Sequence, residues 1–353
     1  MRAFLRSPLR WWTTLGAGLA LTALACNAPE ASSMKSATRE SATAPTSDSN
    51  LAPTRDSTIA PTDGSAIAPT PDAQTVPKSV AFDGARAWEH LRRQVAFGPR
   101  PSGTPALAQT RKYIIDQLRA IGIGAREQAF IGSTPLGEVS MANVVATIPG
   151  KRPDRIAYAS HYDTKLFREI RFVGANDGAS STAALLELAR VFKAQPHEFT
   201  IELIFFDGEE ARMPEWRGLD NTYGSRRYVE DAGNTGTLRG LKTLVLLDMI
   251  GDKNLTIRRD SNSTPWLVDI IWATAARLGH LSTFPNELTT IEDDHIPFAR
   301  AGVPVVDIID LENPTWHTAQ DTLDNVSQKS LQIVGDVVVA AAPEIEKRVA
   351  SMK

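Results

Sequence analysis

Strand-length runs of apolar residues alternate with helical patterns along most of this 353-residue chain, and this alternation restricts its possible folds more than any other feature. The apolar runs span residues 143–148, 156–160, 200–206, 243–248 and 303–308. Between several of them, apolar residues recur at helical spacing, notably in residues 180–192 and 266–278. Continuous apolar strands joined by helices are typical of a mostly parallel, mixed sheet that helices cover on both faces. The sequence therefore predicts an α/β fold of this kind.

The first 25 residues have the layout of a bacterial lipoprotein signal peptide. Three arginines precede an apolar run over residues 11–25, which is shorter than the roughly 20 residues that a membrane span requires. Cys26, the one cysteine of the chain, directly follows this run. We therefore expect lipidation at Cys26 and an exported bacterial lipoprotein, anchored on the periplasmic or cell-surface side of a membrane. Cleavage after Ala25 without lipidation is the alternative.

Residues 26–79 consist mainly of Ser, Thr, Ala, Pro and Asp, and Ala-Pro-Thr recurs in them at a constant spacing. A proline in every repeat prevents both helices and strand pairing, so we expect a disordered tether. Residues 80–353 then form one catalytic domain, of a size that is usual for an α/β enzyme. The formal net charge of −3, which becomes more negative when the leader arginines are removed, disfavours binding to nucleic acid. We expect a monomer that meets the membrane only through its lipid anchor.

Polar side chains follow the predicted strands at the points where the strands end. They are His161 and Asp163 after one strand, Asp207, Glu209 and Glu210 after the next, and Asp248 after a third, with Asp177 and His317 in loops. In an open α/β sheet, ligands bind at this rim. Carboxylates and imidazoles without cysteine suit Zn²⁺, which keeps three protein ligands and an open position in catalytic sites. Within the Glu209-Glu210 pair, one side chain can hold the metal while the other serves as general acid or base.

Five motifs, taken in their order along the chain, resemble the zinc aminopeptidase and glutaminyl cyclase superfamily. They are His161-Tyr162-Asp163, Gly-Ala-Asn-Asp-Gly-Ala at 174–179, Phe-Asp-Gly-Glu-Glu-Ala at 206–211, Leu-Asp-Met-Ile-Gly at 247–251, and Trp316-His317-Thr318. The resemblance covers residues 97–326 and implies the zinc-aminopeptidase-like fold of the phosphorylase/hydrolase type. Two chemistries are possible within this superfamily. A di-zinc aminopeptidase would use five ligands that are all present, so ligand identity leaves the choice open: His161, Asp177, Glu210, Asp248 and His317.

The surroundings of these ligands resemble glutaminyl-peptide cyclotransferases. The segments that carry this resemblance are Trp216, residues 223–226, residues 292–298 and Trp316. These aminoacyltransferases convert an N-terminal glutamine of peptides or proteins into pyroglutamate and release ammonia. The resemblance implies that Glu209 transfers a proton from the attacking amine to the departing ammonia, beside one Zn²⁺ held by Asp177, Glu210 and His317. It also implies that Asp248 holds the amine or the leaving nitrogen, that Asp293 supports it through a hydrogen bond, and that the glutamine pocket is walled by Trp216, Trp316 and Phe298. A place in the hydrophobic core is the alternative for Trp216 and for Phe298.

Several residues near the expected site have more than one interpretation. His161 and Asp163 are expected to support the zinc ligands, and His295 to bond the backbone. Asp307 stands where animal cyclases have a histidine, so it adds a carboxylate that must share a proton with its neighbours. A di-zinc aminopeptidase, with a second zinc on His161 and Asp248, is the alternative enzyme. A non-catalytic binding lipoprotein on the same fold is the third interpretation.

Overall fold

The computed structural model describes residues 80–352, so the signal peptide, Cys26 and the tether predicted for residues 1–79 lie outside the described part. The helices are α1 (Gly84–Ala96), α2 (Pro105–Ala120), α3 (Ala179–Lys193), α4 (Tyr223–Asn234), α5 (Pro265–Arg277), α6 (His295–Arg300) and α7 (Gln328–Ser351), with short 3-10 turns η1 (Thr237–Gly240) and η2 (Leu323–Asn325). The strands are β1 (Ala125–Thr134), β2 (Gly137–Ile148), β3 (Arg152–His161), β4 (Phe199–Phe206), β5 (Leu241–Asp248), β6 (Arg259–Asp260), β7 (Leu288–Thr289) and β8 (Val305–Ile309). Among these helices, none is long and apolar enough to cross a membrane.

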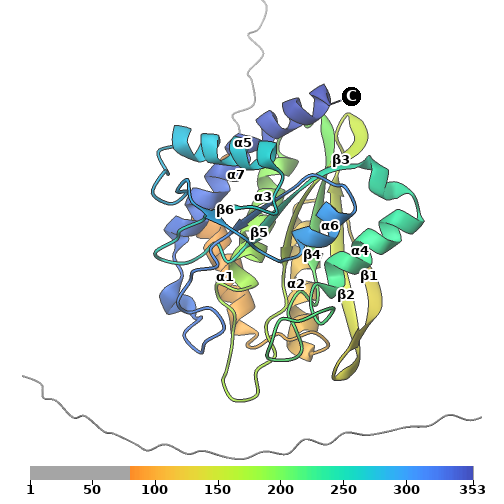
Figure 1. Cartoon of the computed structure of the whole chain (residues 1–353), viewed down its shortest axis with the longest axis vertical. Coiled ribbons are helices and arrows are strands. Elements are labelled where there is room, and N and C mark those ends of the chain that lie inside the picture. Colours follow the sequence, from red (N-terminus) through yellow and green to blue (C-terminus); the bar gives the residue numbers. More distant parts are fainter. Residues whose placement is uncertain (1–79, 353) are drawn as a thin grey trace, which may run out of the picture. The chain divides into compact units, whose positions relative to one another are not determined.

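Six strands form the main sheet, in the order β1-β2-β4-β3-β5-β8 (Figure 1). β4, β3, β5 and β8 run parallel to one another, whereas β1 and β2 form an antiparallel hairpin in which β2 also pairs antiparallel with β4. The two short strands β6 and β7 pair with each other outside the main sheet. The predicted mixed, mostly parallel sheet is therefore confirmed, and the hairpin with β1 is an addition that the sequence did not predict.

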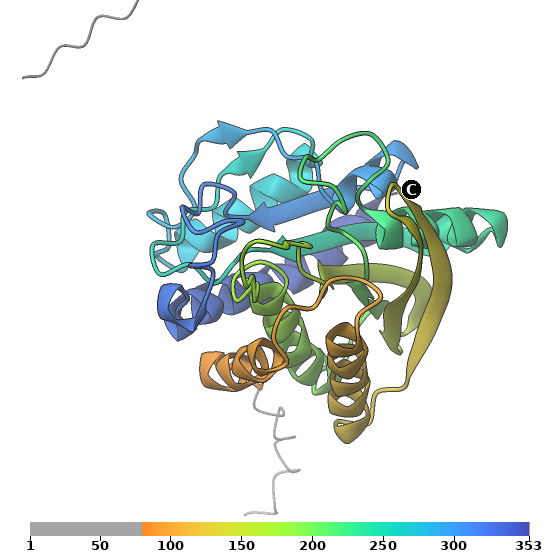
Figure 2. The ribbon, with the colours of Figure 1, turned by 90° about the horizontal axis from the view of Figure 1, so that it is seen from below.

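Side chains of the central strands alternate between two buried faces. In β4, Leu203 and Phe205 enter a large core, whereas Ile204 and Phe206 enter a smaller one. Helices α1, α2, α3, α5 and α7 cover the large core, and α4 and α6 cover the smaller one. Figure 2 shows α1, α2 and α3 side by side on one side of the sheet. Burial on both faces explains why these strands are continuous apolar runs.

The turn before α3 places Asp177 at the carboxyl ends of the strands. Gly178 precedes this helix with a φ of 85°, in the left-handed region that glycine adopts without strain. A Cβ atom on Gly178 would lie 2.5 Å from the backbone oxygen of Asp163, which follows β3. The chain can therefore pass close to the end of β3, and Asp177 enters the site from this turn.

Candidate active site

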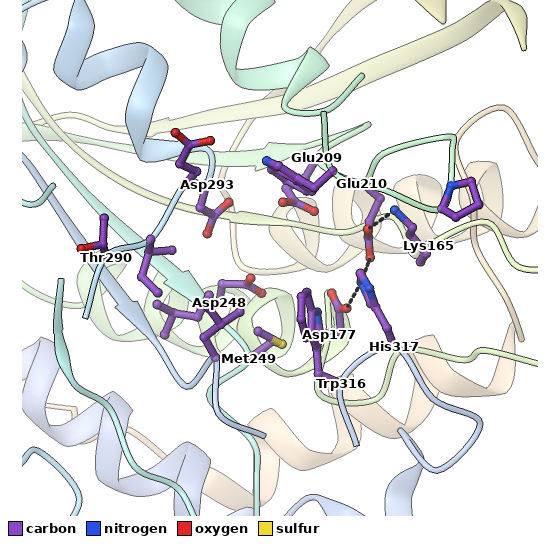
Figure 3. Close-up of a pocket in the computed structure, with 16 residues that line it drawn as sticks. Lys165, Asp177, Glu209, Glu210, Asp248, Met249, Thr290, Asp293, Trp316 and His317 are labelled. Atoms are coloured by element: carbon purple, nitrogen blue, oxygen red, sulfur yellow. Dashed lines mark hydrogen bonds and ion pairs between the residues drawn. The ribbon is translucent and has the colours of Figure 1, made fainter. Parts of the chain in front are cut away.

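The predicted polar residues come together around a cavity of about 350 Å³ at the carboxyl edge of the parallel strands (Figure 3). His161 ends β3, Glu209 and Glu210 follow β4, Asp248 ends β5, Asp177 precedes α3, Asp293 precedes α6, and His317 lies in the loop after β8. Parallel strands deliver their ends to one edge, so residues far apart in the sequence become neighbours here.

Asp177, Glu210 and His317 form a group that fits a metal ion. Nε2 of His317 lies 3.3 Å from Oδ2 of Asp177 and 3.2 Å from Oε1 of Glu210. Burial lowers the pKa of His317, but the two carboxylates raise it more, to about 10, so they favour a positive charge at this point. Asp177 Oδ2 and Glu210 Oε2 are buried and accept no hydrogen bond from residues 80–352. Carboxylates and imidazoles are common zinc ligands. A zinc ion here would supply the positive charge that the carboxylates favour and a partner for the two oxygens that lack one.

His317 has a left-handed backbone conformation, and its ring packs against aromatic neighbours. Its φ is 54°, and Trp316 stacks on its ring at a centroid distance of 4.4 Å. Two other residues with left-handed backbone lie at the same site: Met249, which lines the cavity, and Thr222, whose amide N–H donates to the carbonyl oxygen of Glu209. These are the three non-glycine residues within 80–352 that have a positive φ. Backbone strain of this kind concentrates at functional sites.

Glu209 lies beside the metal group, and its side chain lines the cavity. The amide N–H groups of Glu209 and Glu210 donate to the two carboxylate oxygens of Asp163, at 3.2 and 3.4 Å, which fixes the turn after β4. Burial raises the pKa of Glu209 well above its usual value; His161 opposes this shift, whereas the carboxylates of Glu210 and Asp293 add to it. A carboxyl group with a raised pKa suits proton transfer near neutral pH.

His161 connects Asp248 to Asp177. Its Nε2 lies 3.0 Å from Oδ1 of Asp248 and 3.2 Å from Oδ1 of Asp177. These three residues form a second group with metal-ligand spacing, which shares Asp177 with the first. All five candidate ligands therefore come together. His161 is buried and, unlike the other four, is absent from the cavity wall, so the group around His317 is the more open to a substrate.

Lys165 is a cavity residue that sequence reasoning did not single out. Its side chain is 2% exposed, and its Nζ lies 3.7 Å from Oε2 of Glu210. Lysine is rarely buried without a carboxylate partner, but the burial of Lys165 is visible only in the structure. Lys165 balances part of the negative charge of Glu210 from the side opposite to His317 (Figure 3).

Two buried charged residues hold the loop before α3 from both sides, and sequence reasoning missed them as well. Arg100 donates to the carbonyl oxygens of residues 173–174 at 2.7 and 3.0 Å. Asp321 accepts from the amides of residues 176–177 at 2.6 and 3.0 Å. Because Asp321 follows His317 closely in sequence, it connects the loops that carry two of the candidate metal ligands.

The two tryptophans expected in the pocket, Trp216 and Trp316, do line the cavity, and their contact with substrate stays a prediction. The assignment of Phe298 to the pocket wall is wrong, and its alternative, a place in the hydrophobic core, is the one that the structure shows. Its ring is fully buried in the smaller core, at centroid distances of 5.9 Å from Phe206 and 5.5 Å from Tyr228. Phe298 therefore packs α6 against the sheet and α4 and does not reach the cavity.

His295 does not bond the backbone, contrary to expectation. Its Nε2 lies 3.2 Å from Oδ2 of Asp260, and its Nδ1 lies 3.4 Å from Oδ2 of Asp307. Burial and the nearby charge of Asp248 raise the pKa of Asp293 to about 7. Burial, with Asp293 and Asp248, raises the pKa of Asp307 well above its usual value. These raised pKa values agree with a proton shared among the carboxylates.

A mostly parallel sheet with histidine and carboxylate side chains of metal-ligand spacing at its carboxyl edge is the arrangement that zinc-dependent peptidases and related enzymes share. The sequence matches Peptidase family M28 over residues 143–342. It is 34% identical over 274 residues to a glutaminyl-peptide cyclotransferase-like protein of Bos taurus, and the match covers 69% of this chain and 71% of that protein. The chain belongs to peptidase family M28 and, within it, to the glutaminyl-peptide cyclotransferases.

Solved structures with the same fold represent both chemistries. A glutaminyl cyclase of an Acidobacteriales bacterium superposes with a TM-score of 0.73 at 40% identity, over 80% of this chain and 100% of that one. A leucine aminopeptidase precursor from Bacteroides thetaiotaomicron superposes with a TM-score of 0.70 at 29% identity, over 75% and 98%. The fold alone is therefore compatible with either reaction.

Proposed function

We propose that this chain closes the N-terminal glutamine of peptides and proteins into pyroglutamate and releases ammonia, and that it does so with one zinc ion held by Asp177, Glu210 and His317. The observation that carries this proposal is the position of Glu209. A buried carboxyl group with a raised pKa lies next to a metal group, and both face one cavity. Membership of the glutaminyl-peptide cyclotransferases supports the same reaction.

We assign each residue of the cavity a separate role in the reaction. Asp177, Glu210 and His317 would hold the zinc ion, which would supply Lewis-acid chemistry at the γ-carbonyl of glutamine. Glu209 accepts a proton from the α-amine as the amine nitrogen attacks this carbonyl, and then donates it to the departing ammonia. Asp248 and Asp293, on the other side of Glu209 from the metal group (Figure 3), hold the reacting nitrogen. Both reacting groups belong to one residue, so the main task of Trp216 and Trp316 is to keep the glutamine bent.

A di-zinc aminopeptidase is the second candidate, and the metal-ligand spacing of the group around His161 favours it. Incubation with glutamine naphthylamide separates the two reactions. A cyclase releases ammonia and leaves the bond to the naphthylamine intact, whereas an aminopeptidase releases free naphthylamine. Zinc analysis of the active protein provides a second measurement. We expect one zinc per chain, and two zinc ions together with naphthylamine release would contradict the proposal.

We further propose that the enzyme is exported and anchored through Cys26, on the periplasmic or cell-surface side of a membrane. The support comes from the sequence, in which arginines and a short apolar run precede this cysteine. The substrates would then be peptides or proteins outside the cytoplasm that begin with glutamine.

A further inference from the structure

A second, smaller cavity of about 80 Å³ adjoins the candidate active site, and we call it the side groove. Trp216, Glu292 and Asp293 belong to the walls of both cavities, so the two cavities lie next to each other. The rest of the groove wall comes from residues 218–222, from α4 and from α6. The roles assigned above leave this groove without a ligand.

A peptide substrate has to leave the main cavity beyond its first residue. The main cavity, of about 350 Å³, is at the lower end of the range for ligand pockets, roughly 300–1,000 Å³, so it suits the N-terminal glutamine and little more. In the proposed reaction Asp293 helps to hold the reacting amine, on the opposite side of the cavity from His317 (Figure 3). The Cα atom that carries this amine also carries the carbonyl group that leads to the second residue. The second residue therefore begins beside Asp293, which is also part of the side groove.

Two arginines give the side groove a positively charged wall. Arg226 lies in α4, and Arg300 is the last residue of α6. The neighbouring Arg227 pairs with Asp231 at 2.9 Å, whereas neither Arg226 nor Arg300 pairs with a carboxylate of residues 80–352. A guanidinium group is charged throughout the physiological pH range, and its N–H groups match the two oxygens of a carboxylate. The groove therefore offers two cations to an anionic ligand.

Arg226 is held in a fixed position by one end of its guanidinium group. Nη2 donates to the carbonyl oxygens of Leu219 and Asn221 at 2.7 and 2.8 Å, and Nε donates to that of Asn221 at 3.3 Å. The group also lies over the ring of Tyr223, 5.0 Å from its centroid. Nη1, at the other end, makes no hydrogen bond with the described residues. This nitrogen can donate to a ligand without any loss of the contacts that hold the arginine.

Arg300 is exposed and is placed near Arg226 by helix packing. Phe298 of α6 stacks on Tyr228 of α4 at a centroid distance of 5.5 Å, and both rings are buried in the smaller core. This contact fixes α6 against α4. The two arginines consequently stand on a common rigid support, as a specific binding site requires.

We propose that the side groove binds the residue that follows the N-terminal glutamine, and that Arg226 and Arg300 make the enzyme prefer an acidic side chain at this second position. The inference rests on the proposed function and adds a preference among its substrates. Both arginines determine specificity and take no part in the chemical step.

Two carboxyl groups also line the groove and limit the preference. Glu292 is exposed where the two cavities meet. Burial and the nearby charge of Asp248 raise the pKa of Asp293 to about 7, so Asp293 is only partly ionised at neutral pH. Two full positive charges therefore face one full and one partial negative charge, and the groove still favours an anion.

The test compares three peptides that differ only in their second residue: Gln-Glu-Ala, Gln-Gln-Ala and Gln-Lys-Ala, each with an amidated C-terminus. Glutamine at the second position has the shape of glutamate without its charge. The amidated end removes the terminal carboxylate, so that a side chain alone can supply the anion. We measure kcat and KM with the full-length, zinc-loaded protein at low ionic strength and again at about 1 M salt.

We expect kcat/KM for Gln-Glu-Ala to exceed that for Gln-Gln-Ala by about twofold to fivefold, the range for ion pairs that are partly open to solvent. The difference should lie in KM, because the arginines bind the substrate and its transition state equally. Gln-Lys-Ala should be the poorest substrate, and about 1 M salt should remove most of the preference. Equal values for the glutamate and glutamine peptides would overturn the inference, as would a preference for lysine.

Three variants test the residues themselves. Arg300→Gln should bring the ratio of the glutamate peptide to the glutamine peptide close to one. Arg239→Gln is the matched control and should keep the wild-type ratio, because Arg239 is also exposed but lies in η1 and lines neither cavity. Glu292→Gln should raise the ratio, since it removes the opposing charge. An unchanged ratio in Arg300→Gln would contradict the proposed role.

Binding without turnover separates this inference from the proposed function. In zinc-loaded Glu209→Gln, calorimetry should give a Kd for Gln-Glu-Ala about twofold to fivefold below that for Gln-Gln-Ala, and addition of Arg300→Gln should abolish the difference. Equal Kd values would overturn the inference even if the enzyme is an active cyclase. A wild-type protein that releases no ammonia would refute the proposed function, while the Kd values would still decide whether the groove selects an acidic residue.

Discussion

Replacement of Asp321 by asparagine should weaken zinc binding and leave the fold intact. The Asp321 carboxylate accepts hydrogen bonds from the backbone amides of Asn176 and Asp177, at 2.6 and 3.0 Å. An asparagine keeps one acceptor oxygen and places an NH₂ group against the other amide. Burial and the neighbouring Asp177 raise the pKa of Asp321 to about 7, so the carboxylate is charged above that pH. There, a hydrogen bond to this charged group contributes about 1.5–3 kcal/mol. Since about 1.4 kcal/mol corresponds to a factor of ten, zinc affinity should fall roughly ten- to hundredfold.

The loss should appear in zinc binding because Asp177 can ligate only while its loop keeps the conformation that Asp321 stabilises. Competition with a chelator of known affinity measures this directly. Asp324→Asn is the control, because Asp324 lies in the same loop region with an exposed side chain. Saturating zinc should restore the kcat of Asp321→Asn, since Asp321 does not line the cavity. Equal zinc affinities for Asp321→Asn and the wild type would refute the reasoning.

Three further substitutions test the remaining assignments. Glu209→Gln should keep its zinc and lose about 10²–10⁴ in kcat, because it removes the proton acceptor and no ligand; turnover near the wild-type value would contradict this role. His317→Ala should lose zinc in metal analysis, because it removes one of three ligands, and wild-type occupancy would exclude it as a ligand. Cys26→Ser should release the protein from the membrane fraction with unchanged kcat/KM. Continued retention would show that the anchor lies elsewhere.

The strands that could be predicted from the sequence are those buried on both faces. The apolar runs at 200–206 and 243–248 correspond to β4 and β5, which are almost entirely buried. β1 was not predicted, because most of its side chains are exposed or half-buried and it contains no apolar run. It pairs with β2 along its whole length, so backbone hydrogen bonds rather than a buried face define it. Such pairing leaves little trace in the sequence.

The same limit applies to the site. The ends of parallel strands converge, so His161, Glu209 and Asp248 could be placed together from sequence. The partners of His295 could not, because they come from strands of two different sheets. Phe298 shows another limit: its hydrophobicity predicts burial but does not tell whether the ring lies in the cavity wall or in the core.

The proposal of one zinc ion at the five candidate ligands is supported by the contact between His161 and Asp248. Asp177 and one further carboxylate already match the charge of a single Zn²⁺ beside His317. Burial lowers the pKa of His161, but the carboxylates of Asp248 and Glu209 raise it well above its usual value, so His161 and Asp248 form an ion pair of their own. A second zinc would displace the proton of His161 and break its ion pair with Asp248. One zinc keeps this ion pair intact, and it leaves Asp248 in the cavity wall, where it can hold the substrate nitrogen.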